Sequence, residues 1–183
     1  MPHDRVAAGR RLALTVIETL VSTVIVFFLL QTFVARTFAV EQTSMQSTLE
    51  PGQEVIVDRL TPAFSPYKRG DIVVFAAPDQ TGREEPLIKR VIGVGADLVE
   101  LRDGTVYVNG QPLSEPYAFG GEPTVPIGAA TTWIVPNGWL FVLGDHRSVS
   151  VDSRAFGPIP VSGVVGRAWL RLLPLNRLQI LSP

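Results

Sequence analysis

The distribution of hydrophobic residues divides the chain into two parts, and the first part is a continuous apolar run. From Leu12 to Ala35 the only charged side chain is that of Glu18. A helix of about 24 residues is roughly 36 Å long, enough to cross a hydrocarbon core of about 30 Å with some tilt. We therefore expect a transmembrane helix over residues 12–35.

The charges on either side of this run predict its orientation. Arginines precede it at positions 5, 10 and 11, whereas only Arg36 follows closely. Because cytoplasmic flanks carry the excess of arginine and lysine, the chain is expected to cross the plasma (inner) membrane once and to contact the lipid bilayer. The predicted parts are a cytoplasmic N-terminus (1–11), an anchor (12–35) and an extracytoplasmic domain (36–183).

A cleaved signal peptide is the alternative for the same segment. Its apolar region is longer than the hydrophobic core of a signal peptide, and the small-residue pair Thr37 and Ala39 is a poor cleavage site. These two features favour an anchor that stays attached.

Polar side chains recur at helical spacing within the apolar run and form one stripe. A polar stripe in a membrane helix is a candidate contact with another helix, for example in a translocase. The alternative is that the hydroxyl groups bond back to their own helix and the carboxylate reaches the interface. The members of the stripe are Thr15, Glu18, Thr19, Ser22 and Thr23.

Beyond Val40 the pattern changes to short β-rich runs separated by proline and glycine clusters. The predicted strands are Glu54–Asp58, Asp71–Phe75, Leu87–Val94, Thr105–Val108 and Trp139–Leu143. Asp103-Gly104 and Asn109-Gly110 flank one of these strands and are typical of tight turns. Residues 117–132 are rich in glycine, proline and alanine and are expected to form a long loop. The fold class is therefore mostly β, preceded by one N-terminal transmembrane helix.

Composition excludes several function classes. The net charge is −1 and the isoelectric point is about 6.1, so the chain has no electrostatic reason to bind nucleic acid. It has no cysteine, so neither a disulfide framework nor a thiolate zinc site is expected. His3 and His146 lie on opposite sides of the apolar run, which argues against a histidine metal centre. We expect no metal and no cofactor.

The predicted strand at 87–94 carries two cations in an otherwise apolar sequence. Alternation places Lys89 on one face and Arg90 on the other. A buried lysine loses the hydration of its charged form, so its pKa falls. To act as a base near neutrality, its pKa must fall from about 10.4 to about 7. The alternative is a lysine that reaches the rim or pairs with a carboxylate, and the strand alone favours this alternative.

Ser44 is a candidate nucleophile in a hydroxyl-rich stretch soon after the apolar run. A hydroxyl nucleophile needs an adjacent base, which residues distant in sequence can supply. A serine in such a stretch is otherwise typical of a cap or a turn.

A third polar segment, at residues 144–157, combines acids, arginines and serines behind a predicted strand. Ser150, Asp152 and Arg154 are two residues apart, so they share a face in an extended run. Such a cluster can orient a lysine amine through the serine hydroxyl while the ion pair fixes the loop. A solvated turn is the alternative.

Taken together, these segments resemble the bacterial type I signal peptidases (leader peptidases), which use a Ser–Lys dyad. The resemblance runs from Leu12 to the end of the chain. Its motifs are Ser44-Met45 with Thr48-Leu49, Gly70 to Phe75, Lys89 to Gly93, the Asn109-Gly110 hairpin, Gly144 to Gly157 and Pro174 to Arg177.

The resemblance implies a fold and a set of roles. The fold is an antiparallel β catalytic domain with a small inserted β lobe, here expected at residues 97–133. Ser44 is the implied nucleophile and Lys89 the implied general base. Ser150 would hold the lysine, and Asp152 with Arg154 would support the site as an ion pair.

The implied reaction is removal of signal peptides from exported preproteins, with cleavage after small residues at −1 and −3. Four residues of this chain match positions that line the shallow apolar pockets of the family: Phe38, Val40, Leu49 and Ile88.

The chain departs from the family pattern at three positions. Ser47 stands where proline is common, and His146 stands where asparagine is usual. Gln42 stands where relatives have serine or glycine at the oxyanion site. We therefore assign the oxyanion contact to the backbone N–H of Ser44, with Gln42 as a further candidate. Losing one oxyanion donor costs about 2.7–4 kcal/mol in kcat.

Three other readings compete with this one. Eukaryotic and archaeal relatives place histidine where this chain has Lys89. Self-cleaving repressors share the dyad but begin with a helix-turn-helix segment instead of an apolar run. A non-catalytic, membrane-tethered β module that binds exported proteins is the alternative from a different functional class.

Overall fold

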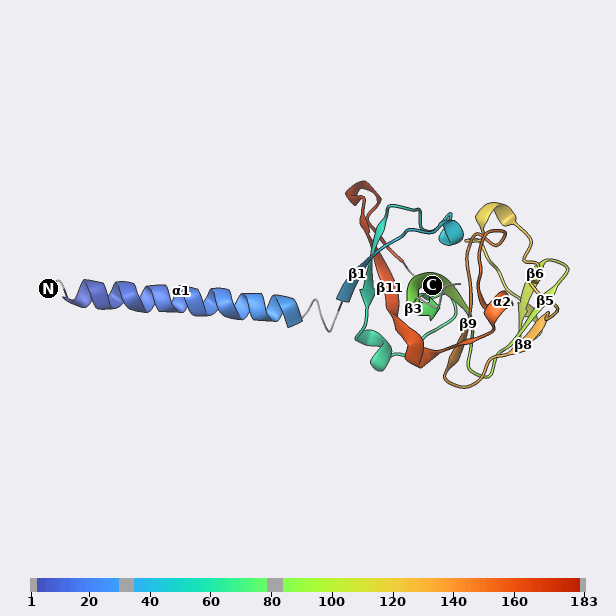
Figure 1. The fold of residues 1–183 in the computed structure, drawn as a ribbon, viewed down its shortest axis with the longest axis horizontal. Helices are drawn as coiled ribbons and strands as arrows, with labels where there is room; N and C mark the ends of the chain where they lie inside the picture. The colour runs from blue at the N-terminus through green and yellow to red at the C-terminus, as the bar shows by residue number, and fades with distance from the viewer. Residues whose placement is uncertain (1–2, 30–34, 79–83, 182–183) are drawn as a thin grey trace.

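A computed structural model describes residues 3–29, 35–78 and 84–181 of the chain. It consists of one long helix, α1 (His3–Leu29), followed by a β domain (Figure 1). The prediction of a mostly β, antiparallel fold is confirmed.

Within the described ranges, no helix combines the length and the apolar character that crossing a membrane requires. The predicted anchor at 12–35 includes residues 30–34, which lie outside those ranges. The anchor therefore stays a prediction.

Three hydroxyl groups of the polar stripe bond within α1. Thr19 Oγ1 and Thr23 Oγ1 each donate to the carbonyl four residues earlier, at 2.8 Å, and Ser22 Oγ donates to the Thr19 carbonyl at 3.0 Å. These bonds agree with the alternative in which the hydroxyl groups bond back to their own helix, so these three groups need no partner helix for hydrogen bonding.

The larger sheet of the β domain is antiparallel and has the strand order β1-β2-β11-β3-β4-β9-β10, with β12 paired to β11. Its strands are β1 (Ala35–Ala39), β2 (Glu54–Asp58), β3 (Ile72–Pro78), β4 (Glu84–Val94), β9 (Trp139–Leu143), β10 (Ile159–Pro160), β11 (Val164–Leu173) and β12 (Gln179–Ile180). β4 lies between β3 and β9. Its residues Ile88, Val91 and Ile92 are buried in core clusters, so side chains from both of its faces pack in the core.

A second, four-stranded sheet is built from residues 98–134, the region where the inserted lobe was predicted. Its order is β7-β6-β5-β8, with β5 (Leu98–Arg102), β6 (Thr105–Val108), β7 (Gln111–Pro112) and β8 (Thr132–Ile134). Two-residue turns join β5 to β6 and β6 to β7 at the predicted Asp103-Gly104 and Asn109-Gly110 pairs. All four turn residues have positive φ, which these residue types tolerate best.

The predicted strands agree with the structure except at their ends. β2, β6 and β9 have the expected boundaries, and β3 and β4 are longer than expected. Several strands were not predicted from the sequence pattern, and the longest of them is β11, which is the second longest strand described. Its pairings with β2 and β3 shift register at three points, so inward and outward residues do not alternate regularly along it.

β11 can pack in the middle of the sheet because it carries Gly166. A Cβ at this position would overlap the Asp58 carbonyl oxygen and lie 2.8 Å from a Val57 methyl group.

We predict that Gly166→Ala lowers the free energy of unfolding by about 1–3 kcal/mol, since a crowded core strand must shift to accept the added methyl group. Gly128→Ala is the control, because nothing lies within 4 Å of its added Cβ. Equal thermal midpoints for the two variants would contradict this packing argument.

Candidate active site

Ser44 lies in a short 3-10 turn, η2 (Thr43–Met45), that follows β1. The turn is held from both sides: the next residue, Met45, is buried in the core, and the Ser44 carbonyl accepts the His146 N–H at 3.0 Å. Ser44 is only 6% exposed. The backbone of the turn therefore fixes the direction of the serine side chain.

Lys89 reaches this serine from β4. Its Nζ lies 2.7 Å from Ser44 Oγ and 3.2 Å from the Ile88 carbonyl oxygen, and it donates to both. The residue is 1% exposed. The structure thus brings together the two residues predicted as nucleophile and base, which are 45 positions apart in the sequence.

Burial changes the protonation of this lysine. It lowers the pKa of Lys89 from its usual 10.5 to about 8, against the opposing effect of the Asp152 and Asp145 carboxylates. At pH 7 about a tenth of such an amine is neutral, compared with less than about one in a thousand for an exposed lysine. A neutral amine can accept the proton of a hydroxyl group at hydrogen-bond distance.

The Asp152–Arg154 pair fixes the loop behind the lysine. Arg154 Nε and Asp152 Oδ1 are 2.8 Å apart, and both side chains are almost completely buried. Asp152 also accepts the Gly144 N–H at 3.0 Å, while Arg154 Nη2 donates to the carbonyls of Arg147 and Ser150 at 2.8 and 3.1 Å. The expected ion pair is therefore present, and its hydrogen bonds run mainly to the backbone of the loop.

Ser150 is buried beside these groups. Its Oγ accepts or donates no hydrogen bond among the residues that the structure describes. A Cβ on Gly144 would overlap this Oγ. It would also lie 2.5 Å from Ser150 Cβ and 2.6 Å from the Ser44 carbonyl oxygen, both too close for a carbon atom. Glycine at 144 therefore lets the loop approach the nucleophile turn. The role of Ser150 in holding Lys89 stays a prediction.

Sequence reasoning missed a second buried ion pair, between Arg90 and Asp145. Arg90 donates to both carboxylate oxygens at 2.9 and 2.8 Å, and its guanidinium lies 4.0 Å from the centre of the Tyr117 ring. Thr48 Oγ1 also donates a short hydrogen bond to Asp145. The sequence feature that could have predicted this pair is Arg90 itself, because an arginine buried in an apolar strand requires an acidic partner.

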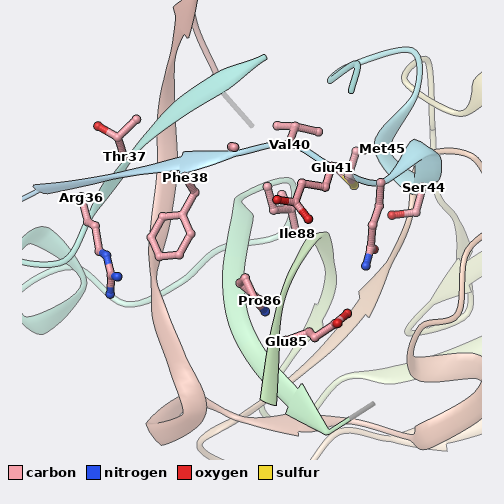
Figure 2. A pocket seen from close by; sticks show the side chains of 12 residues that line it. Arg36, Thr37, Phe38, Val40, Glu41, Ser44, Met45, Glu85, Pro86 and Ile88 are labelled. Atoms are coloured by element: carbon pink, nitrogen blue, oxygen red, sulfur yellow. The ribbon is translucent and has the colours of Figure 1, made fainter. Parts of the chain in front are cut away.

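A pocket of about 350 Å³ opens beside Ser44, between β1 with the segment that follows it and β4 (Figure 2). Phe38, Val40 and Ile88 line it, as does Met45. Leu49 does not line this pocket. It is 0% exposed and packs in the core cluster that contains Val40, Met45 and Ile88, so it supports the apolar wall from behind.

A second pocket, of about 590 Å³, contains the dyad itself. Lys89 and Ser44 line it together with Val149, Val151 and Leu87. Gln42, Glu41 and Glu85 border both pockets. Figure 2 shows the Glu41 and Glu85 side chains directed into the space between the two strands. A chain lying along both pockets would pass directly over Ser44.

Comparison with known proteins agrees with this geometry. The family model described as "Signal peptidase, peptidase S26" matches residues 13–173. The chain belongs to the signal peptidase family, peptidase S26. Because the match takes in both Ser44 and Lys89, the dyad lies within the part of the chain that the family shares.

Individual relatives of this family cover most of the chain. The signal peptidase I of Leptolyngbya laminosa is 37% identical over 172 residues, covering 91% of this chain and 83% of the relative. The signal peptidase I of Bacillus caldolyticus is 36% identical over 159 residues, covering 81% and 85%. A solved signal peptidase I from Enterococcus faecalis V583 is 34% identical, has a TM-score of 0.45, and aligns with 56% of this chain and 97% of its own. The family match and the two curated relatives show that the chain is an enzyme of the serine peptidase class.

The buried amine should make this signal peptidase less stable than it would be without it. A pKa lowered from 10.5 to about 8 corresponds to roughly 3 kcal/mol that favour unfolding below pH 8, and this cost disappears as the pH rises towards 10.5. Lys89→Met removes this cost, while the loss of the hydrogen-bond partner of Ser44 Oγ offsets part of the gain. We therefore predict that the substitution raises the free energy of unfolding at pH 7 by about 1–3 kcal/mol.

The measurement is thermal unfolding of the detergent-solubilised chain at pH 7 and again near pH 10. Lys68→Met is the matched control, because Lys68 is exposed and is the other lysine of the chain. A Lys89→Met variant that is no more stable than wild type at pH 7, or whose gain does not shrink with rising pH, would contradict the cost of burial.

Proposed function

We propose that this peptidase removes N-terminal signal peptides from exported preproteins, with Ser44 as nucleophile and Lys89 as general base. The observation that carries the proposal is the 2.7 Å contact between Lys89 Nζ and Ser44 Oγ inside the buried site. The lowered pKa of Lys89 supports the role of base. The relatives named signal peptidase I support the choice of reaction.

The reaction is acyl transfer in two steps. When Nζ is neutral, Ser44 Oγ passes its proton to it and attacks the carbonyl carbon of the residue at −1. The resulting ammonium of Lys89 then donates that proton to the leaving amine of the mature protein, which leaves an ester on Ser44. Neutral Lys89 next takes a proton from a water that attacks the ester, and the serine is restored. No metal or cofactor takes part in these steps.

The oxyanion formed in each step needs a hydrogen-bond donor. We assign this role to the backbone N–H of Ser44, since the turn η2 is fixed by Met45 in the core and by the contact with His146. Gln42 borders the pocket and is a second candidate donor. A preorganised backbone donor has no reorganisation cost when the charge develops.

The loop at 144–154 keeps the base oriented. Ser150 would donate to or accept from Lys89 Nζ once the amine turns towards it, because its buried Oγ has no other bond among the described residues. Asp152 and Arg154 fix the loop through their mutual ion pair and backbone contacts, and the His146 N–H bonds the loop to η2.

Specificity for small residues would come from the shallow pocket. Phe38, Val40 and Ile88 give it apolar walls, and Leu49 supports them from the core. In an extended peptide the side chains at −1 and −3 point the same way. Both would enter this pocket, where small side chains fit and bulky ones overlap the walls.

The site would act outside the cytoplasm. The apolar run at 12–35 would anchor the peptidase in the lipid bilayer, with residues 1–11 in the cytoplasm and residues 36–183 on the other side. The second sheet would form the inserted lobe at 97–133. This topology places Ser44 close to the membrane surface, where the signal of a translocated preprotein ends.

The first test is cleavage of a preprotein whose signal ends in Ala-x-Ala. Wild-type, detergent-solubilised chain should cut it after the −1 alanine, and Ser44→Ala and Lys89→Ala should lower kcat by at least about 10³-fold. Lys89→Arg should be equally inactive, since a guanidinium keeps its proton at working pH. Lys68→Ala should retain activity. Normal cleavage by the Ser44 and Lys89 variants would remove the dyad assignment, and the non-catalytic binding module would then be favoured.

The second test is the pH profile. Because burial lowers the pKa of Lys89 to about 8, kcat/KM should rise about tenfold per pH unit below pH 8 and level off above it. The fraction of neutral amine sets this slope. A profile that is flat between pH 6 and pH 8 would show that no group of this pKa must lose a proton.

A further inference from the structure

His146 lies where three parts of the molecule meet, and the proposed mechanism uses only its backbone. Its N–H donates to the Ser44 carbonyl at 3.0 Å. The neighbouring Asp145 accepts from Arg90 of β4, and the Asp145 carbonyl accepts the Phe119 N–H at 2.9 Å. Residues 145 and 146 thus join the nucleophile turn, the strand of the base and the turn η4 (Phe119–Gly121).

The imidazole ring makes its own contacts with two of these parts. It stacks on the Phe119 ring with 4.2 Å between centroids and an angle of 31°. Its Nδ1 lies 3.2 Å from Gln46 Oε1, two residues beyond the nucleophile, and its Nε2 lies 3.6 Å from a Glu122 carboxylate oxygen. Only 14% of the side chain is exposed.

The direction of the Gln46 contact follows from the other end of the same amide. Gln46 Nε2 donates to Glu50 at 2.6 Å, so the amide oxygen faces the ring of His146. An amide oxygen only accepts, and therefore His146 Nδ1 carries the proton and donates it. This bond links the chain just after Ser44 to a ring that is held by Phe119.

The segment that holds the ring belongs to a connection of the second sheet and not to the catalytic strands. Phe119 and Glu122 lie on the connection between β7 and β8, and Glu122 also accepts the Ser148 N–H at 3.2 Å. In Figure 1 the yellow turn at Phe119–Gly121 lies beside the cyan turn that carries Ser44. The second sheet is therefore connected to the nucleophile turn through the contacts of the His146 ring with Phe119 and Gln46.

We propose that His146 is a positioning residue for this peptidase: its ring, stacked on Phe119 and bonded to Gln46, holds the Ser44 turn in register with Lys89. The inference deepens the proposed function and rests on it. The hydrogen bond and the stack act on the nucleophile and not on the base, because no contact joins the His146 ring to Lys89 among the described residues. A displaced Oγ would slow the chemical step more than it weakens substrate binding.

The experiment compares variants by the single-turnover rate constant of preprotein cleavage at saturating enzyme, which does not depend on how much of each variant is folded. His146→Phe retains a ring against Phe119 but cannot donate, and Gln46→Leu removes the acceptor. Each should lower the rate constant about 3- to 10-fold, as expected for one hydrogen bond, with little change in KM. Since both remove the same bond, the double variant should be about as slow as either single variant.

Two controls separate positioning from general damage. His146→Asn restores a donor at this place and should recover part of the rate, whereas Ser148→Ala, exposed in the same loop, should match wild type. The pH at which kcat/KM levels off should be the same in all variants, because Lys89 is untouched.

Two results would overturn the inference while leaving the dyad intact: wild-type rate constants for His146→Phe and Gln46→Leu, or a double variant whose loss is the product of the single losses. Absence of cleavage by the wild-type chain would overturn the proposed function, and this inference with it.

Discussion

The site depends on one contact, the buried hydrogen bond between the Lys89 amine and the Ser44 hydroxyl. Burial does two things at once: it removes water from the charged form of the lysine, which lowers its pKa to about 8, and it holds the amine at bonding distance from the nucleophile. Lys89 lies on β4, a strand inside the sheet, and its side chain is buried against the turn that carries Ser44. Burial of the amine therefore lowers the free energy of unfolding, and the same burial gives Lys89 a pKa at which it can act as a base near neutral pH.

The carboxylates near the lysine work against this effect, and the fold limits them by pairing. Asp145 and Asp152 both raise the pKa of Lys89. Each is bonded to a buried arginine, Arg90 and Arg154 respectively, at 2.8 Å. Desolvation has the larger effect on the pKa of Lys89, and the positive charge of each arginine opposes the attraction of its acid for the ammonium. The Arg90–Asp145 pair ties the loop at 144–154 to β4, and the Asp152–Arg154 pair fixes the loop internally. The His146 N–H then bonds this loop to the nucleophile turn, which links the electrostatics of the site to its geometry.

Much of this arrangement could be predicted from the sequence, and the parts that could not have physical reasons. Strands such as β2, β6 and β9 show regular patterns and turn residues at their ends, whereas β11 has register shifts that break its alternation. Ser44 and Lys89 could be proposed only when the three polar segments were taken together and compared with a known family, because the strand of Lys89 alone favours a lysine at the rim or in an ion pair. The Arg90–Asp145 pair and the contacts of the His146 ring join residues 55 and 100 positions apart, and no local pattern encodes such distances. The placement of Leu49 behind the pocket instead of in its wall likewise depends on packing.

The most direct test of this account is the titration of the Lys89 amine itself. The chain has two lysines, so a Lys68→Arg variant labelled with ¹³C-lysine gives the Cε signal of Lys89 alone, free of overlap. The account predicts that this signal titrates with a pKa of about 8. A midpoint near 10.5, the value of an exposed lysine, would show that the amine stays charged at neutral pH and would contradict its role as the base.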